Sequence, residues 1–79
     1  MSDEYIPIDC DLYSRYELAI LHHQALKVAW RDSDGNPHLQ RLLPLDLNTR
    51  QHVEYLRVRT EDDQILELRL DRIIRAEPC

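Results

Sequence analysis

Glycine is almost absent from this sequence of 79 residues: Gly35 is the only one. Phosphate-binding loops are rich in glycine because backbone must approach the phosphate closely, so that class of nucleotide site is excluded. No apolar run approaches the roughly 20 residues that span a bilayer, so we expect no membrane partner. The opening Met-Ser-Asp-Glu-Tyr is acidic where a secretion signal is basic and then apolar, which predicts a cytoplasmic protein.

Cysteine is also scarce, with only Cys10 and Cys79. Because the expected compartment is reducing, both are predicted to be free thiols. Cys10 has no placed base, and the carboxylates of Asp9 and Asp11 beside it oppose a thiolate. We therefore expect Cys10 to be a small buried residue before a helix and not a nucleophile.

Basic residues are outnumbered, 10 against 15 acidic ones, for a formal net charge of −5. Five acidic residues and one basic residue, a balance of −4, lie in residues 1–20: Asp3, Glu4, Asp9, Asp11, Glu17 and Arg15. An acidic surface repels phosphate, so direct nucleic-acid binding is disfavoured and a basic partner is favoured. A solvated face that only adds solubility is the alternative interpretation.

The composition is that of a small globular protein, with 43% hydrophobic and 32% charged residues. We expect a single domain over residues 1–79. A chain of this length closes one core and leaves little room for a deep catalytic cleft.

The first part of the chain predicts an extended arm over residues 1–10 and a helix over 11–24. Asp11 is the expected N-cap, and the helical period is clearest from Leu12 to His23. One side of that helix is mostly apolar and is expected to face the core: Leu12, Tyr16, Ala19, Ile20 and His23. Ser14 and Glu17 lie on the opposite side, with Tyr13 at its edge.

From Ala25 the apolar period changes to two, which indicates strands. Five antiparallel strands are predicted over residues 25–31, 38–43, 53–59, 65–70 and 73–76. Pro44 is expected to end the second strand, and residues 46–52 to form a polar loop with at most one helical turn capped by Asp46 or Asn48. In the turn over 32–37, Gly35 or Asn36 is expected to take positive φ.

A strand set of this size most readily curls into an SH3-like barrel. The expected fold class is mainly β, with one N-terminal α-helix before a five-stranded antiparallel barrel over residues 25–76.

No catalytic, cofactor or metal site is predicted. His22 and His23 point about 100° apart on a helix, so they do not form the i, i+4 pair of a metal site. Asp11 and Glu17 would be solvated on a single short helix, where they make a poor general acid and base. We expect a protein that is not an enzyme and binds no cofactor.

A further set of residues, spanning about 5–74, occurs in a distinctive order. It comprises Tyr5, Pro7, Ile8, Cys10, Asp11, Tyr13, Glu17-Leu18-Ala19, His22-His23, Asp34-Gly35, Asp46-Leu47, Arg50, Val53-Glu54-Tyr55-Leu56 and Leu68-Arg69-Leu70-Asp71-Arg72-Ile73. In this combination the chain resembles the Rho-binding antiterminator family.

The resemblance implies an Sm-like barrel behind a helix and a monomer that binds the N-terminal RNA-binding domain of the hexameric termination factor Rho. Family members block the primary RNA site and so inhibit Rho-dependent transcription termination. The implied contact surface is the exposed side of the helix together with the loop before the Val-Glu-Tyr-Leu strand. Carried over, this predicts the partner-binding residues Asp11, Tyr13, Ser14, Glu17, Arg50 and Gln51, although Ser14, Arg15 and Gln51 depart from the family's pattern.

The competing interpretation is an Sm-type RNA-binding protein that forms rings. The barrel alone would permit it, because a fold does not fix a function. The net charge of −5 argues against it.

Overall fold

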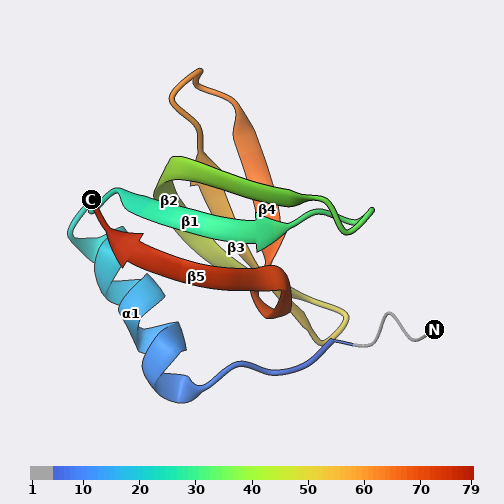
Figure 1. Ribbon diagram of the computed structural model, residues 1–79. Helices are drawn as coiled ribbons and strands as arrows, with labels where there is room; N and C mark the ends of the chain where they lie inside the picture. Colours follow the sequence, from blue (N-terminus) through green and yellow to red (C-terminus); the bar gives the residue numbers. More distant parts are fainter. Residues whose placement is uncertain (1–4) are drawn as a thin grey trace.

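The structure is a computed structural model in which residues 5–79 are described (Figure 1). Its elements are helix α1 (Cys10–Leu21), strands β1 (Leu26–Arg31), β2 (Pro37–Arg50), β3 (Val53–Arg59) and β4 (Ile65–Arg69), the 3-10 turn η1 (Leu70–Arg72) and strand β5 (Ile73–Pro78). Of the arm predicted over 1–10, residues 1–4 lie outside the described residues.

The strands form one five-stranded sheet in the order β4-β3-β2-β1-β5, with every neighbouring pair antiparallel. A mainly β fold with one N-terminal helix and five antiparallel strands is therefore confirmed. Strands β4 and β5 end the order and do not pair with each other, so the curled sheet is not closed by hydrogen bonds. Helix α1 packs beside it, below β1 and β5 in the view of Figure 1.

Strand β2 is the main departure from the predicted elements. It continues through Pro44 to Arg50, so the predictions of a strand end at Pro44 and a polar loop over 46–52 are wrong. The register shifts between Pro44 and Asp46, and such a bulge accepts a proline because the ladder is already interrupted there. Beyond the shift, Leu47 pairs with Leu56 of β3, and this pairing across strands outweighs the polar local sequence.

The buried residues confirm most of the predicted pattern of apolar positions in the helix and the strands. The buried members of the core come from α1, from strands β1 to β4 and from η1: Tyr16, Ala19, Leu26, Val28, Trp30, Leu42, Leu56, Val58, Leu68 and Leu70. Leu12 and Ile20 pack against this core while remaining partly exposed. The turn after β1 is also as expected, with Gly35 at a φ of 84°.

Helix α1 begins earlier than predicted. Its N-cap is Asp9, whose carboxylate accepts a hydrogen bond of 3.0 Å from the backbone N–H of Asp11, so the assignment of Asp11 as N-cap is wrong. Cys10 is consequently the first helical residue and is exposed, contrary to the expectation that it is buried before the helix. Both Cys10 and Cys79 are free thiols at the surface of the structure.

The helix ends at Leu21 in a Schellman motif, a tight turn that returns two backbone hydrogen bonds to the last helical carbonyls. The N–H of His23 donates to Ile20 at 3.2 Å, and that of Gln24 donates to Ala19 at 2.8 Å. His23 adopts a φ of 54°, a conformation normally taken by glycine. This left-handed residue leaves the helical phase, so His23 is exposed and the expectation that it faces the core is wrong.

Replacing His23 with Gly is expected to raise the free energy of unfolding by about 1 kcal/mol, because glycine has no Cβ to strain the left-handed conformation. Urea denaturation of both proteins measures the change. His22→Gly is the matched control: its φ is −94°, so glycine relieves no strain there and should not stabilise the protein. No gain for His23→Gly, or an equal gain for both variants, would contradict the assignment of strain to His23.

Candidate partner-binding surface

Helix α1 carries four of the six predicted contact residues. Asp11, Ser14 and Glu17 are exposed, whereas Tyr13 is half-buried and packs against the core. At 100° per residue, Asp11 and Glu17 lie about 120° apart around the helix, so they do not form one cluster. Tyr13 and Glu17 are neighbours one turn apart, and the surface is best described around them.

Tyr13 lies among three carboxylates. Burial raises the pKa of the Tyr13 hydroxyl, and the negative charges of Glu54, Glu17 and Asp46 raise it further. The fold therefore brings Asp46 of β2 and Glu54 of β3 next to the helix, although both are far from Tyr13 in sequence. We call Tyr13, Glu17, Asp46 and Glu54 the acidic surface.

Asp46 and Glu54 belong to the sequence motif, but neither was predicted to contact a partner. No local pattern marks them, since Asp46 was expected in a loop and Glu54 in a strand whose register was unknown. Only the pairing of β2 with β3 and the packing of α1 on β2 place them beside Tyr13.

Arg50, the fifth predicted contact residue, is held by its own chain. Its Nη2 and Nη1 atoms donate to the two carboxylate oxygens of Glu67 on β4, at 2.8 and 3.2 Å. Its guanidinium carbon lies 4.3 Å from the centre of the Tyr55 ring. The mutual hydrogen bonds raise the pKa of Arg50 and lower that of Glu67. Arg50 thus has a fixed position and is not among the residues of the acidic surface.

Gln51, the sixth, lies in the two-residue turn that joins β2 to β3. Gln51 and His52 have φ angles of 50° and 67°, and Arg50 pairs with Val53 across the turn. Positive φ at both central residues is the type I′ pattern, which usually carries Asn-Gly. Neither residue here is glycine, so the turn is strained, and strain of this kind often accompanies functional sites.

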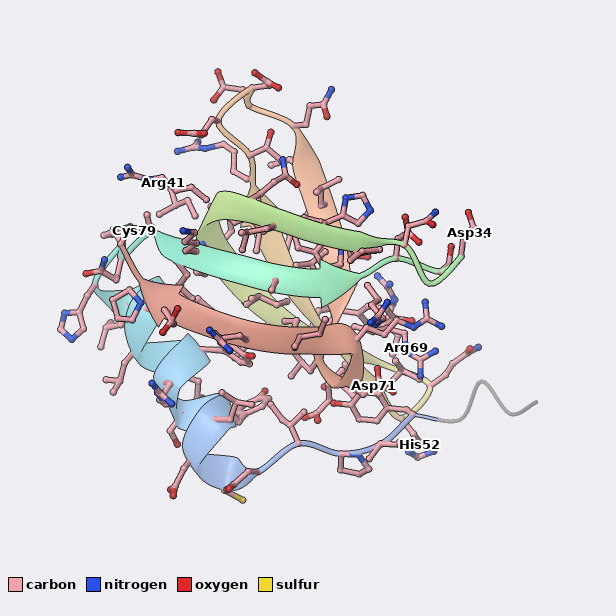
Figure 2. The ribbon with its side chains drawn as sticks, in the orientation of Figure 1. Asp34, Arg41, His52, Arg69, Asp71 and Cys79 are labelled. Carbon is pink, nitrogen blue, oxygen red and sulfur yellow. The ribbon has the colours of Figure 1, made fainter. Side chains whose placement is uncertain are left out.

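The arm before helix α1, residues 5–9, connects the acidic surface with the β2–β3 turn. The Tyr5 hydroxyl donates a 2.8 Å hydrogen bond to Glu54 Oε1, and the Ile6 backbone N–H donates to Asp71 Oδ2 at 3.1 Å. Figure 1 shows the arm running from the β2–β3 turn to the start of α1. In Figure 2, Asp71 and His52 lie on either side of it.

Asp71 is itself fixed by Arg69. The Arg69 guanidinium donates from Nε to Oδ1 at 3.1 Å and from Nη2 to Oδ2 at 2.8 Å, a bidentate ion pair. The two side chains are only 11% and 8% exposed, and they lie together at η1 in Figure 2. This pair is the anchor to which the arm is tied.

Several residues on which the family resemblance rests therefore contact one another in the structure. Tyr5 meets Glu54, Arg50 meets Tyr55, and Arg69 meets Asp71. These three contacts surround the arm and the β2–β3 turn. Much of the motif therefore holds the arm and the β2–β3 turn in place. The spacing of these residues in the sequence does not reveal that role.

Within residues 5–79, no group of three or more His, Cys, Asp or Glu side chains is placed to hold a metal ion. His22 and His23 are both exposed. That the protein binds no metal and no cofactor stays a prediction. The one α-helix of the described chain is too short to cross a membrane.

The chain was compared with known proteins. No family model matches it. It is 42% identical over 73 residues to the protein rof of Escherichia coli (strain K12) and, to the same extent, to that of Shigella flexneri. Each alignment covers 92% of this chain and 81% of the relative. At this identity and coverage, the chain belongs to the rof family, the Rho-binding antiterminators that its sequence resembles.

Proposed function

We propose that this protein is a regulator of Rho-dependent transcription that binds the N-terminal RNA-binding domain of Rho and blocks its primary RNA site. It acts by occupying that surface in the cytoplasm, without catalysis, without a cofactor and without binding RNA itself. Membership of the rof family supports a role in Rho-related transcription regulation. The domain contacted and the mode of inhibition are the proposal.

The acidic surface is the observation that carries this proposal. A groove that binds RNA phosphates is basic, and its cations lose that function when an acidic protein surface pairs with them. Glu17 is exposed and Tyr13 beside it is half-buried, so the surface offers a charge next to a fixed aromatic ring. Rigid aromatic anchors and charges placed in this way are typical of interface hot spots.

The strained β2–β3 turn forms the second contact in this proposal. Arg50 is ordered by Glu67 and Tyr55, so Gln51 is presented on a rigid support. A preorganised loop loses less conformational entropy on binding than a mobile one. Asp11 and Ser14 complete the contact from the outer side of helix α1.

The RNA-binding ring of Sm type remains the second candidate, and one observation favours it. In the described chain the outer edges of β4 and β5 pair with no other strand, and such edges can join neighbouring copies. The acidic surface disfavours RNA binding, so we expect a monomer. A mass measurement in solution distinguishes a monomer from a ring.

Competition for Rho tests the proposal directly. Labelled RNA bound at the primary site of Rho is expected to be displaced as this protein is added, and the protein alone is expected not to bind that RNA. Fluorescence anisotropy follows both events. Formation of a ternary complex with RNA still in the primary site would refute the blocking mechanism, and direct RNA binding by the protein would favour the ring-forming alternative.

A further inference from the structure

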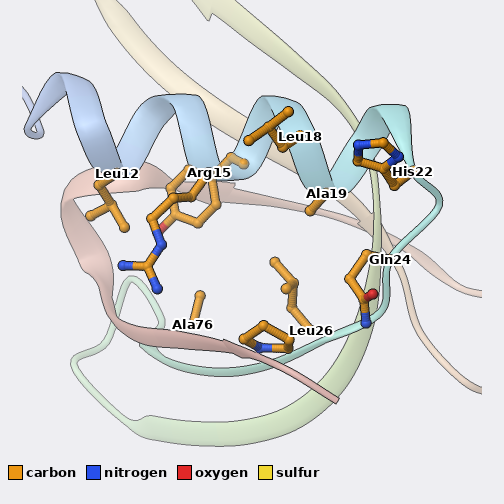
Figure 3. A pocket seen from close by; sticks show the side chains of 10 residues that line it. Leu12, Arg15, Leu18, Ala19, His22, Gln24, Leu26 and Ala76 are labelled. Carbon is orange, nitrogen blue, oxygen red and sulfur yellow. The ribbon is translucent and has the colours of Figure 1, made fainter.

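A groove runs along helix α1 on the flank away from Glu17, with β5 as its opposite wall (Figure 3). Arg15 on this flank lies about 160° around the helix from Glu17. The groove has a volume of about 290 Å³. Most of its wall is apolar, formed by Leu12, Leu18, Ala19, Leu26, Ala76 and Pro78.

Arg15 brings a positive charge into this apolar groove. Figure 3 shows its guanidinium extending from the helix toward the strand that carries Ala76. Among residues 5–79 it has no ion-pair partner, although Asp11 precedes it by one helical turn. Arg15 therefore offers the groove a guanidinium that makes no ion pair with a carboxylate of residues 5–79.

Tyr16 contributes a second polar group that lacks a partner. Its side chain is only 1% exposed and lines the same groove, and its hydroxyl has no hydrogen-bond partner among the described residues. Buried polar groups are nearly always paired, so this one calls for an explanation. Burial raises the pKa of Tyr16 to about 12, so the hydroxyl remains a donor at neutral pH.

A carboxylate in the groove would serve both groups, because it accepts hydrogen bonds from a guanidinium and from a hydroxyl. We propose that the groove binds a small aliphatic carboxylate, with its hydrocarbon chain along the apolar wall and its carboxylate accepting hydrogen bonds from Arg15 and Tyr16. Arginine binds carboxylates through two parallel hydrogen bonds, which are strong because both groups are charged. The groove is about twice the size of an engineered cavity that holds benzene, which suits a ligand of about ten non-hydrogen atoms.

This site is distinct from the acidic surface, although Asp11, another proposed contact residue, lies one helical turn before Arg15. Tyr13 and Glu17 lie on one flank of helix α1, and Arg15 lies on the other. The ligand site therefore goes beyond the proposed function, and it can be tested with the protein alone.

Decanoate is a suitable probe, with decanol and decylammonium as ligands of matched chain and different head group. Titration followed by backbone amide NMR shifts is expected to show saturable changes at residues that line the groove. Decanoate should bind about tenfold more tightly than decanol, the ratio expected for a charge-assisted hydrogen bond, and decylammonium should bind more weakly still. No saturable change at millimolar decanoate, or equal affinity for the three probes, would overturn the proposal.

Three variants test the residues assigned to the head group. Arg15→Gln should lower the affinity for decanoate about tenfold and leave that for decanol unchanged, since only the charged contact is lost. Tyr16→Phe should lower the affinity for decanoate by a smaller factor. Arg75→Gln is the control, because Arg75 is an exposed arginine of β5 that does not line the groove. Unchanged decanoate affinity in Arg15→Gln, with the fold intact by circular dichroism, would overturn the proposal.

Discussion

Asp71→Asn is expected to lower the free energy of unfolding by about 3 kcal/mol. The substitution keeps the shape of the side chain and removes the charge that accepts two hydrogen bonds from Arg69. Both side chains are almost enclosed, so water compensates poorly for the lost partner, and breaking a buried pair on one side is strongly destabilising. Urea denaturation of wild type and variant measures the difference.

The same change should also loosen the arm. Asp71 Oδ2 accepts the hydrogen bond from the Ile6 backbone N–H, which should therefore exchange with solvent faster in the variant. Asp62→Asn is the matched control, since Asp62 is exposed in the turn between β3 and β4. Its stability should change by less than about 0.5 kcal/mol, as for ordinary surface substitutions. Equal stability of the two variants would show that Arg69 and Asp71 do not anchor the arm.

Glu17→Lys is expected to weaken binding to Rho by about 2 kcal/mol or more, which is over tenfold in affinity. The reversed charge would face the basic groove that the acidic surface is proposed to occupy. Folding should change by less than about 0.5 kcal/mol, because Glu17 is exposed on the side of the helix opposite the core. Titration of Rho with both proteins, accompanied by thermal melts, separates the two effects.

Salt provides a second test of the same surface. Wild-type binding should weaken as the salt concentration rises, since exposed interfacial charges are screened, and the variant should respond less. Glu61→Lys is the control: it makes the same charge change at an exposed site in the β3–β4 turn, far along the sheet from the arm. Equal affinities for wild type and Glu17→Lys, with both folded, would mean that the first helix is not the contact surface.

The local hydrophobic pattern predicted correctly those elements whose buried face is set by residues only a few positions apart. The alternation Leu26, Val28, Trp30 predicted β1 because one face of a strand must enter the core, and all three side chains are buried. The helical period from Leu12 placed Tyr16 and Ala19 in the core for the same reason. Gly35 took positive φ because no other residue adopts it as readily.

Strand pairing and the hydrogen bonds at the two helix ends decided the features that the local hydrophobic pattern predicted wrongly. Pro44 stays within β2 because a register shift removes the need for its missing N–H. His23 and the Gln51-His52 turn adopt positive φ without glycine, since the hydrogen bonds of the helix end and the pairing of β2 with β3 hold them there. Cys10 is exposed because the cap lies at Asp9, two residues before the predicted cap at Asp11.

For the candidate site, the sequence by itself determined the acidic character of the first helix and, through the resemblance, the family. The resemblance also implied Tyr13 and Glu17 as contact residues, and the helical period of 3.6 residues placed both on the helix away from its apolar side. Only the tertiary structure decided that Asp46 and Glu54 join them and that Arg50 on β2 is bound to Glu67 on β4, across the intervening strand β3. The physical reason is the separation along the chain of the residues that determine each feature. A helical face is fixed by neighbours within one or two turns. A surface made from α1, β2 and β3 depends on strand register and on packing between residues far apart in the chain.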